Sequence, residues 1–199
     1  MQEASSLCHS LIEVEDSVLI VIDVQERFLA KLPSAERRLL VNRIGWLIDA
    51  AAQLDVPIIA TAENIPELGG VVPPIAQRLS SQVPVFSKTV FGLAEDREIL
   101  SAVIETGRST AILVGLETDV CVAHSALGLI DRGFEVVVVA DGTGTPGRGQ
   151  EIGLERVRRA GGLVSSVKAV YYEWVRTVEG DERFFDQAGT ADLPEGVSL

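Results

Sequence analysis

Cysteine and histidine are scarce in this chain: its 199 residues include two cysteines, Cys8 and Cys121, and two histidines, His9 and His124. The two cysteines lie far apart, and no Cys-x-x-Cys pair or Cys/His spacing of the zinc type occurs. This pattern excludes a disulfide framework and a structural zinc centre. We therefore predict a protein without a metal or cofactor, located in the reducing cytoplasm.

Positive charge and long apolar runs are scarce as well. Asp and Glu outnumber Lys and Arg by 29 to 17, and the formal net charge of -12 removes the phosphate attraction that drives nucleic-acid binding. No stretch approaches the roughly 18 consecutive apolar residues of a membrane span. The start, Met1-Gln2-Glu3-Ala4, lacks the basic segment and apolar core of an export signal. We expect neither a nucleic-acid partner nor membrane association.

Apolar residues, by contrast, make up 47% of the chain, and many of them form short runs. These runs are apolar throughout instead of alternating, as is typical of parallel strands covered on both faces: 18–22, 56–61, 83–86, 110–114, 135–140 and 163–165. Spacings of three and four residues between them indicate amphipathic helices at 39–51, 99–104, 122–130 and 152–160. The alternation predicts a three-layer α/β/α doubly wound sheet of about six mostly parallel strands. We interpret residues 1–199 as one domain.

Two segments depart from this alternation. Residues 62–74 contain three prolines and two glycines, which predicts a long irregular loop after the second strand. The segment 177–199 is an acidic C-terminal tail that carries Phe184 and Phe185. This tail either packs on a neighbouring subunit or is loose.

Three polar residues follow predicted strands and are candidates for catalysis. Cys121 opens a predicted helix, where free amides and the positive end of the helix dipole favour a thiolate. Asp23 follows the first strand, and Lys88 ends the third. Taken singly, they have ordinary alternatives: a small buried hydrophobe, a helix cap and a solvated edge residue. In a doubly wound sheet, however, these strand ends can converge on one crevice and unite an acid, an ammonium and a thiol.

Together these residues resemble the isochorismatase-like cysteine hydrolase superfamily, whose hallmark is an Asp, Lys and Cys triad. The resemblance spans most of the chain and is carried by the segments 18–25, 86–88, 115–122, 126–127, 131–133 and 135–141. The segment Glu63-Asn64-Ile65-Pro66, with Leu68, Gly69 and Pro73 after it, is more similar to isochorismatase-domain-containing hydrolases of unassigned substrate than to nicotinamidases.

The resemblance implies a homo-oligomeric hydrolase, a dimer or larger, that cleaves a small amide-like substrate through a thioester on Cys121. In this mechanism Lys88 stabilises the thiolate and lowers its pKa, while Asp23 accepts the thiol proton and delivers it to the leaving group. The backbone N–H groups of Glu117 and Cys121 would form the oxyanion hole. A cis peptide bond between Leu116 and Glu117 is also implied.

Departures from better-known members narrow the substrate. Nicotinamidases carry an Asp-x-His metal motif where this chain has Thr61-Ala62-Glu63-Asn64, so the metal site and nicotinamide are not expected. True isochorismatases lack the nucleophilic cysteine that this chain retains. We predict a substrate pocket lined by four residues, for some of which core packing is the alternative: Gln25, Phe28, Glu63 and Phe91.

Three rival interpretations stay open at this point. His124 follows Cys121 by one helical turn and could form a Cys-His dyad, although a packed histidine is the preferred interpretation. The glycines Gly142, Gly144 and Gly147 spell G-x-G-x-x-G, the signature of a dinucleotide-binding protein, but after the fifth strand and without an acidic ribose ligand. The chain could also be a catalytically idle binding protein of the same fold.

Overall fold

The sheet of the computed structural model, which describes residues 11–188, 193 and 197, has six strands in the order β3-β2-β1-β4-β5-β6. Every neighbouring pair of strands is parallel. The strands are β1 (Ser17–Ile22), β2 (Ile58–Glu63), β3 (Val85–Lys88), β4 (Thr110–Leu116), β5 (Glu135–Gly144) and β6 (Leu163–Ser165). The predicted doubly wound α/β fold is confirmed. All six predicted strands are present, the last at 163–165 as predicted and the other five with one or both ends shifted.

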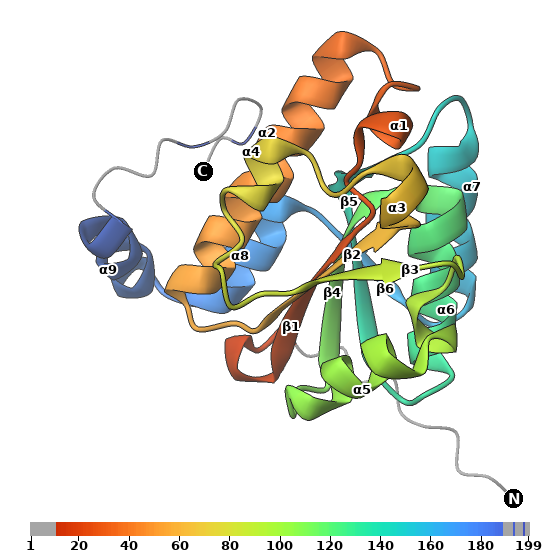
Figure 1. Ribbon diagram of the computed structural model, residues 1–199. Helices are drawn as coiled ribbons and strands as arrows, with labels where there is room; N and C mark the ends of the chain where they lie inside the picture. Colours follow the sequence, from red (N-terminus) through yellow and green to blue (C-terminus); the bar gives the residue numbers. More distant parts are fainter. Residues whose placement is uncertain (1–10, 189–192, 194–196, 198–199) are drawn as a thin grey trace, which may run out of the picture.

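Helices cover both faces of this sheet (Figure 1). On one face lie α2 (Ser34–Gln53), α4 (Pro73–Ala76), α8 (Val167–Val175) and α9 (Val178–Ala188), and on the other α5 (Arg97–Glu105), α6 (Ala123–Ile130) and α7 (Gly149–Arg159). Short elements complete the described part of the chain: α1 (Glu26–Leu29), α3 (Ile65–Leu68), the 3-10 turns η1 (Val14–Asp16) and η2 (Leu93–Glu95), and the π-helical turn η3 (Thr118–Val122).

Strand β1 shows why apolar runs form this sheet. Its side chains alternate between the two layers: Leu19 and Val21 pack with the helices of the α2 face, whereas Val18, Ile20 and Ile22 pack with those of the α6 face. All six residues of the strand are buried. A central parallel strand therefore requires apolar side chains at successive positions, because neither face is open to water.

Two expectations about irregular segments are corrected. Residues 62–74 are not one irregular loop: β2 continues to Glu63, and the prolines lie in the first turns of α3 and α4, where a missing N–H costs nothing. The predicted tail is not loose over residues 178–188, because this part forms α9 and buries Phe184 against Trp46 and Tyr171 of the same chain. Most of the remaining tail lies outside the described residues.

The strand order reverses between β1 and β4, which are neighbours in the sheet but distant in the sequence. At such a point the connections leave in opposite directions and open a crevice at the carboxyl ends of the strands. Gly115, near the end of β4, has φ +126°, and a Cβ there would lie 1.9 Å from the Ile22 carbonyl oxygen. Only glycine lets β4 approach β1 this closely just before the predicted catalytic segment.

Candidate active site

Asp23 occupies the first position after β1 and is wholly buried. Its backbone has φ 50°, a left-handed conformation that Asp tolerates better than most residues, and its N–H donates to the Thr61 carbonyl oxygen at 3.0 Å. The Thr61 hydroxyl donates to Asp23 Oδ1 at 2.9 Å. Two contacts from β2 thus hold Asp23, one through its backbone and one through its carboxylate.

Lys88, at the end of β3, reaches across to the same carboxylate. Its Nζ lies 2.6 Å from Asp23 Oδ2, and both side chains are wholly buried. This contact is an ion pair without the alignment of a hydrogen bond, and Oδ2 has no other partner among the described residues. Nζ also donates to the Val90 carbonyl oxygen at 3.1 Å. Both charges lose their hydration here, which costs free energy of folding. A buried pair of this kind is therefore a candidate for a functional role.

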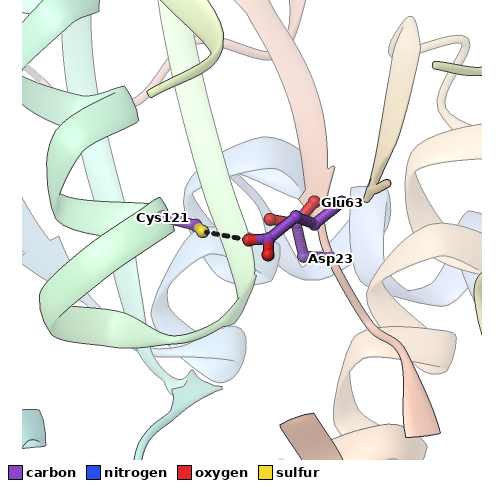
Figure 2. Close-up of side chains that lie close together, drawn as sticks. All are labelled: Asp23, Glu63 and Cys121. Carbon is purple, nitrogen blue, oxygen red and sulfur yellow. Dashed lines mark hydrogen bonds between the residues drawn. The ribbon is translucent and has the colours of Figure 1, made fainter. Parts of the chain in front are cut away.

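Cys121 lies in the turn η3, which links β4 to α6, and is only 3% exposed. Its thiol donates to Glu63 Oε2 over an Sγ to oxygen distance of 3.6 Å. Figure 2 shows the side chain pointing from the start of the α6 segment toward the carboxylates of Asp23 and Glu63. One ligand-type atom from each of these three residues lies within 4.8 Å of the other two. The fold therefore brings the predicted acid, lysine and thiol together.

The electrostatics of the thiol differ from the prediction. Burial raises the pKa of the Cys121 thiol far above its ordinary value, the carboxylates of Asp23 and Glu63 raise it further, and Lys88 lowers it. The predicted sign of the Lys88 effect is thus correct, but burial and the carboxylates outweigh it. The raised pKa favours the protonated thiol of Cys121 over the thiolate.

The turn before Cys121 has the geometry that the resemblance implied. The peptide bond between Leu116 and Glu117 is cis. The Glu117 side chain forms an ion pair with Lys31 at 2.8 Å, which holds the turn against the segment after α1. On the other side α7 packs closely, because a Cβ at Gly153 would lie 2.8 Å from the backbone of Asp119. The backbone around Glu117 and Cys121 is thus held from both sides.

The four predicted pocket residues occupy different environments. Glu63 contacts the Cys121 thiol. Gln25 is wholly buried, and its side-chain amide forms hydrogen bonds with backbone groups of Glu63 and Gly69. Phe28 is buried in the core of the α2 face. Phe91 is 54% exposed, and its ring lies 6.2 Å from that of His124, edge to face. Gln25 and Phe28 therefore hold adjacent segments of the backbone in place, and of the four predicted residues Glu63 contacts the Cys121 thiol.

The rival interpretations fare unequally. His124 packs against Phe91, while the thiol of Cys121 bonds to Glu63 instead. Gly142 and Gly144 lie inside β5, where added Cβ atoms would meet apolar side chains 2.8 to 3.0 Å away, so these glycines serve packing. A cavity of ≈ 660 Å³ does lie beside Gly144 and Gly147, but none of Asp23, Lys88 and Cys121 lines it.

A metal ion would find three potential ligands in Asp23, Glu63 and Cys121. The ammonium of Lys88, 2.6 Å from Asp23, occupies the place that a cation would take beside this carboxylate. The donor set therefore fits the ion pair with Lys88 better than a second positive charge.

Sequence reasoning missed two supporting contacts, those of Thr61 with Asp23 and of Gln25 with Glu63. Both residues follow or end apolar runs, so their position at the sheet edge was visible. The residue that each of them contacts was not visible in the sequence, because the register between β1 and β2 determines which side chains lie opposite each other.

The fold and this arrangement at the sheet edge place the chain in the class of isochorismatase-like α/β hydrolases. Residues 17–169 match the family described as Isochorismatase domain, and the chain belongs to this family. It is 32% identical over 165 residues to the zebrafish (Danio rerio) isochorismatase domain-containing protein 1, covering 82% of this chain and 56% of the relative.

Two solved structures resemble it closely. The YcaC gene product of Escherichia coli, described as an octameric hydrolase of unknown specificity, superposes with a TM-score of 0.81 at 25% identity, covering 89% of this chain and 90% of YcaC. The MAR1 ribonuclease of Caenorhabditis elegans gives a TM-score of 0.80 at 25% identity, covering 96% and 98% of the two chains.

Proposed function

We propose that the chain is a cysteine hydrolase that cleaves a small amide-like substrate through a thioester on Cys121. The observation that carries the proposal is the convergence of a buried Asp23–Lys88 ion pair and the Cys121 thiol at the carboxyl edge of β1, β3 and β4. Such a group has the parts that acyl transfer needs: a nucleophile, a base held in place and a positive charge.

The reaction begins with transfer of the thiol proton to Asp23 as Sγ attacks the carbonyl carbon. The tetrahedral oxyanion is stabilised by the N–H groups of Glu117 and Cys121, and Lys88 offsets the negative charge of the site. The C–N bond breaks when Asp23 returns the proton to the leaving amine. Water, deprotonated by Asp23, then attacks the thioester carbon. The C–S bond breaks, the carboxylic acid leaves, and Asp23 returns its proton to Sγ.

The raised pKa of the Cys121 thiol shapes this mechanism. A nucleophile that rests as a thiol is protected from indiscriminate alkylation, and its activation depends on a correctly placed acyl group. An unreactive resting thiol therefore does not distinguish a hydrolase from an idle binding protein of this fold. Acylation by a substrate does.

The assembly and location are part of the proposal. The octameric description of YcaC supports a homo-oligomer. In the described residues no helix is long and apolar enough to cross a membrane. With two cysteines in the whole chain, we propose the cytoplasm as its compartment.

The test uses a panel of small primary amides with hydroxylamine present. A thioester enzyme transfers its acyl group to hydroxylamine and yields a hydroxamate, besides releasing ammonia. We expect both products from the native protein, an acyl adduct on the Cys121 peptide by mass spectrometry, and neither product from Cys121→Ser. Ammonia without adduct or hydroxamate would contradict the thioester.

RNA is a second candidate substrate, because the MAR1 neighbour is described as a ribonuclease. The net charge of -12 disfavours it, since a surface rich in carboxylates repels phosphates. A labelled single-stranded RNA in the same assay decides: cleavage lost in Cys121→Ser and Asp23→Asn would replace the amide by a phosphodiester.

A further inference from the structure

The backbone of Glu63 is held in place by hydrogen bonds from a buried side chain. Glu63 is the last residue of β2, and the buried Gln25 amide forms two hydrogen bonds with its backbone. Gln25 Oε1 accepts from the Glu63 N–H at 2.7 Å, and Nε2 donates to the Glu63 carbonyl oxygen at 2.9 Å. Nε2 also donates to the Gly69 carbonyl at 2.6 Å. The carboxylate is therefore directed toward Cys121 by a rigid support, not by a flexible loop.

The charges around the thiol do not balance. Two carboxylates, of Asp23 and Glu63, lie within 4.8 Å of Cys121 Sγ and of each other. Lys88 pairs with Asp23 and donates its remaining described bond to the Val90 carbonyl. Within the described ranges, Glu63 has no ion pair. With both carboxylates ionised, the site carries one negative charge more than it neutralises, and this charge belongs to Glu63.

The only side-chain donor found for the Glu63 carboxylate within the described residues is the thiol itself. When Sγ bonds to an acyl carbon, this proton leaves and the carboxylate loses its donor. A half-buried carboxylate without a donor or cation is unfavourable. The molecule bound at Sγ is the group that can replace the lost proton.

We propose that Glu63 is a specificity-determining residue that selects small amides bearing an ammonium or amidinium group near the scissile carbonyl, and that disfavours those bearing a carboxylate. The amide chemistry rests on the proposed function. The charge preference does not, because it is a property of the space around Sγ and can be measured without turnover.

Charged thiol reagents measure this preference directly. The 2-aminoethyl and 2-sulfonatoethyl methanethiosulfonates form a mixed disulfide with a thiol and release methanesulfinate, and they differ chiefly in charge. Peptide mass spectrometry follows Cys121 apart from Cys8. Relative to free cysteine, we expect the native protein to prefer the cationic reagent at Cys121 by about tenfold or more, as charges a few ångströms apart at a partly buried site imply. In Glu63→Gln the preference should fall about tenfold.

A ratio of two reagents cancels any change in the pKa of the thiol, which both share. The matched control is Glu67→Gln, the same change at an exposed position of α3, where Glu67 accepts a hydrogen bond from Asn64 Nδ2. We expect this variant to keep the native ratio. An unchanged ratio in Glu63→Gln, or an equal fall in both variants, would overturn the proposal and assign the preference to the overall charge of -12.

Substrate selection is tested with 4-aminobutanamide and succinamate, two amides of similar length and opposite charge. Native protein should have the higher kcat/KM for the cationic amide, and Glu63→Gln should reduce the ratio about tenfold. If neither amide is cleaved, the proposed function loses support while the reagent ratio still decides the role of Glu63. If both are cleaved with an unchanged ratio, the function stands and the role of Glu63 is wrong.

Discussion

Two buried regions of this molecule, the aromatic cluster on the α2 face and the polar residues at the sheet edge, differ in how burial affects stability. On the α2 face, Trp46, Tyr171 and Phe184 form an aromatic cluster with ring centroids 5.0 to 6.4 Å apart, in which Tyr171 meets each of the other two rings edge to face. At the sheet edge, Asp23, Lys88 and Cys121 are buried just as deeply, but two of them form an ion pair and the third carries a thiol. Burial stabilises the first group and costs free energy in the second. Equal burial therefore serves packing on one side, and on the other its cost supports the chemical role that we propose.

The largest expected effect breaks the site alone. Cys121→Ala should lower kcat of the amide reaction by about 1000-fold or more, because the nucleophile is lost. Its stability should change by less than about 1.5 kcal/mol, since only a sulfur atom is removed from a packed position. Initial rates and denaturant unfolding measure the two. Substantial remaining turnover would show that Cys121 is not the nucleophile.

The next effect breaks the aromatic cluster alone. Phe184→Ala should lower the free energy of unfolding by about 3 to 5 kcal/mol, the usual cost of emptying an aromatic site. The folded fraction should keep the native charge ratio at Cys121. Val178→Ala, at a position 75% exposed on the same helix, serves as the control and should be nearly neutral. A loss in Phe184→Ala no larger than in the control would mean that α9 does not stabilise the core.

The ion pair sharpens the comparison. Lys88→Met leaves the Asp23 carboxylate buried without a cation and should cost about 3 kcal/mol of stability. The double variant Asp23→Asn/Lys88→Met should recover most of this loss while staying inactive, since the uncompensated charge is gone. Lys31→Met removes a pair whose lysine is 43% exposed and should cost less than about 1 kcal/mol. A double variant no more stable than Lys88→Met would contradict a charge-based cost.

The smallest effect is a pH dependence. Above a pH of about 8.5 an unfolded thiol loses its proton, whereas the raised pKa keeps the Cys121 thiol protonated in the fold. The contribution of the Cys121 thiol to the free energy of unfolding is fully present below the pKa of the unfolded thiol. Above that pH it falls, by up to about 1.4 kcal/mol per pH unit. Unfolding at pH 7 and pH 9.5 should therefore show a larger loss for the native protein than for Cys121→Ala. Equal losses of stability in both proteins would mean that the pKa of the Cys121 thiol is not raised in the fold.

Much of this architecture was predictable, because buried parallel strands require apolar runs and strand ends fix where polar residues gather. Asp23, Lys88 and Cys121 were selected as candidates in that way. The balance of charge at Cys121 was not predictable, since its raised pKa depends on how deeply the sulfur is covered. Nor was α9, because nothing in the local sequence shows that Phe184 would meet Trp46, a residue far away in the chain.

Lys88 belongs to β3, a four-residue strand at the edge of the sheet, yet its charge is needed two strands away at Asp23. An edge strand can detach from its neighbour at a much lower free energy than the whole domain unfolds. Whenever β3 opens in this way, the ammonium leaves the site while the core stays intact. The active fraction of molecules would then be governed by this local opening, and hydrogen exchange at the amides of β3 would report it.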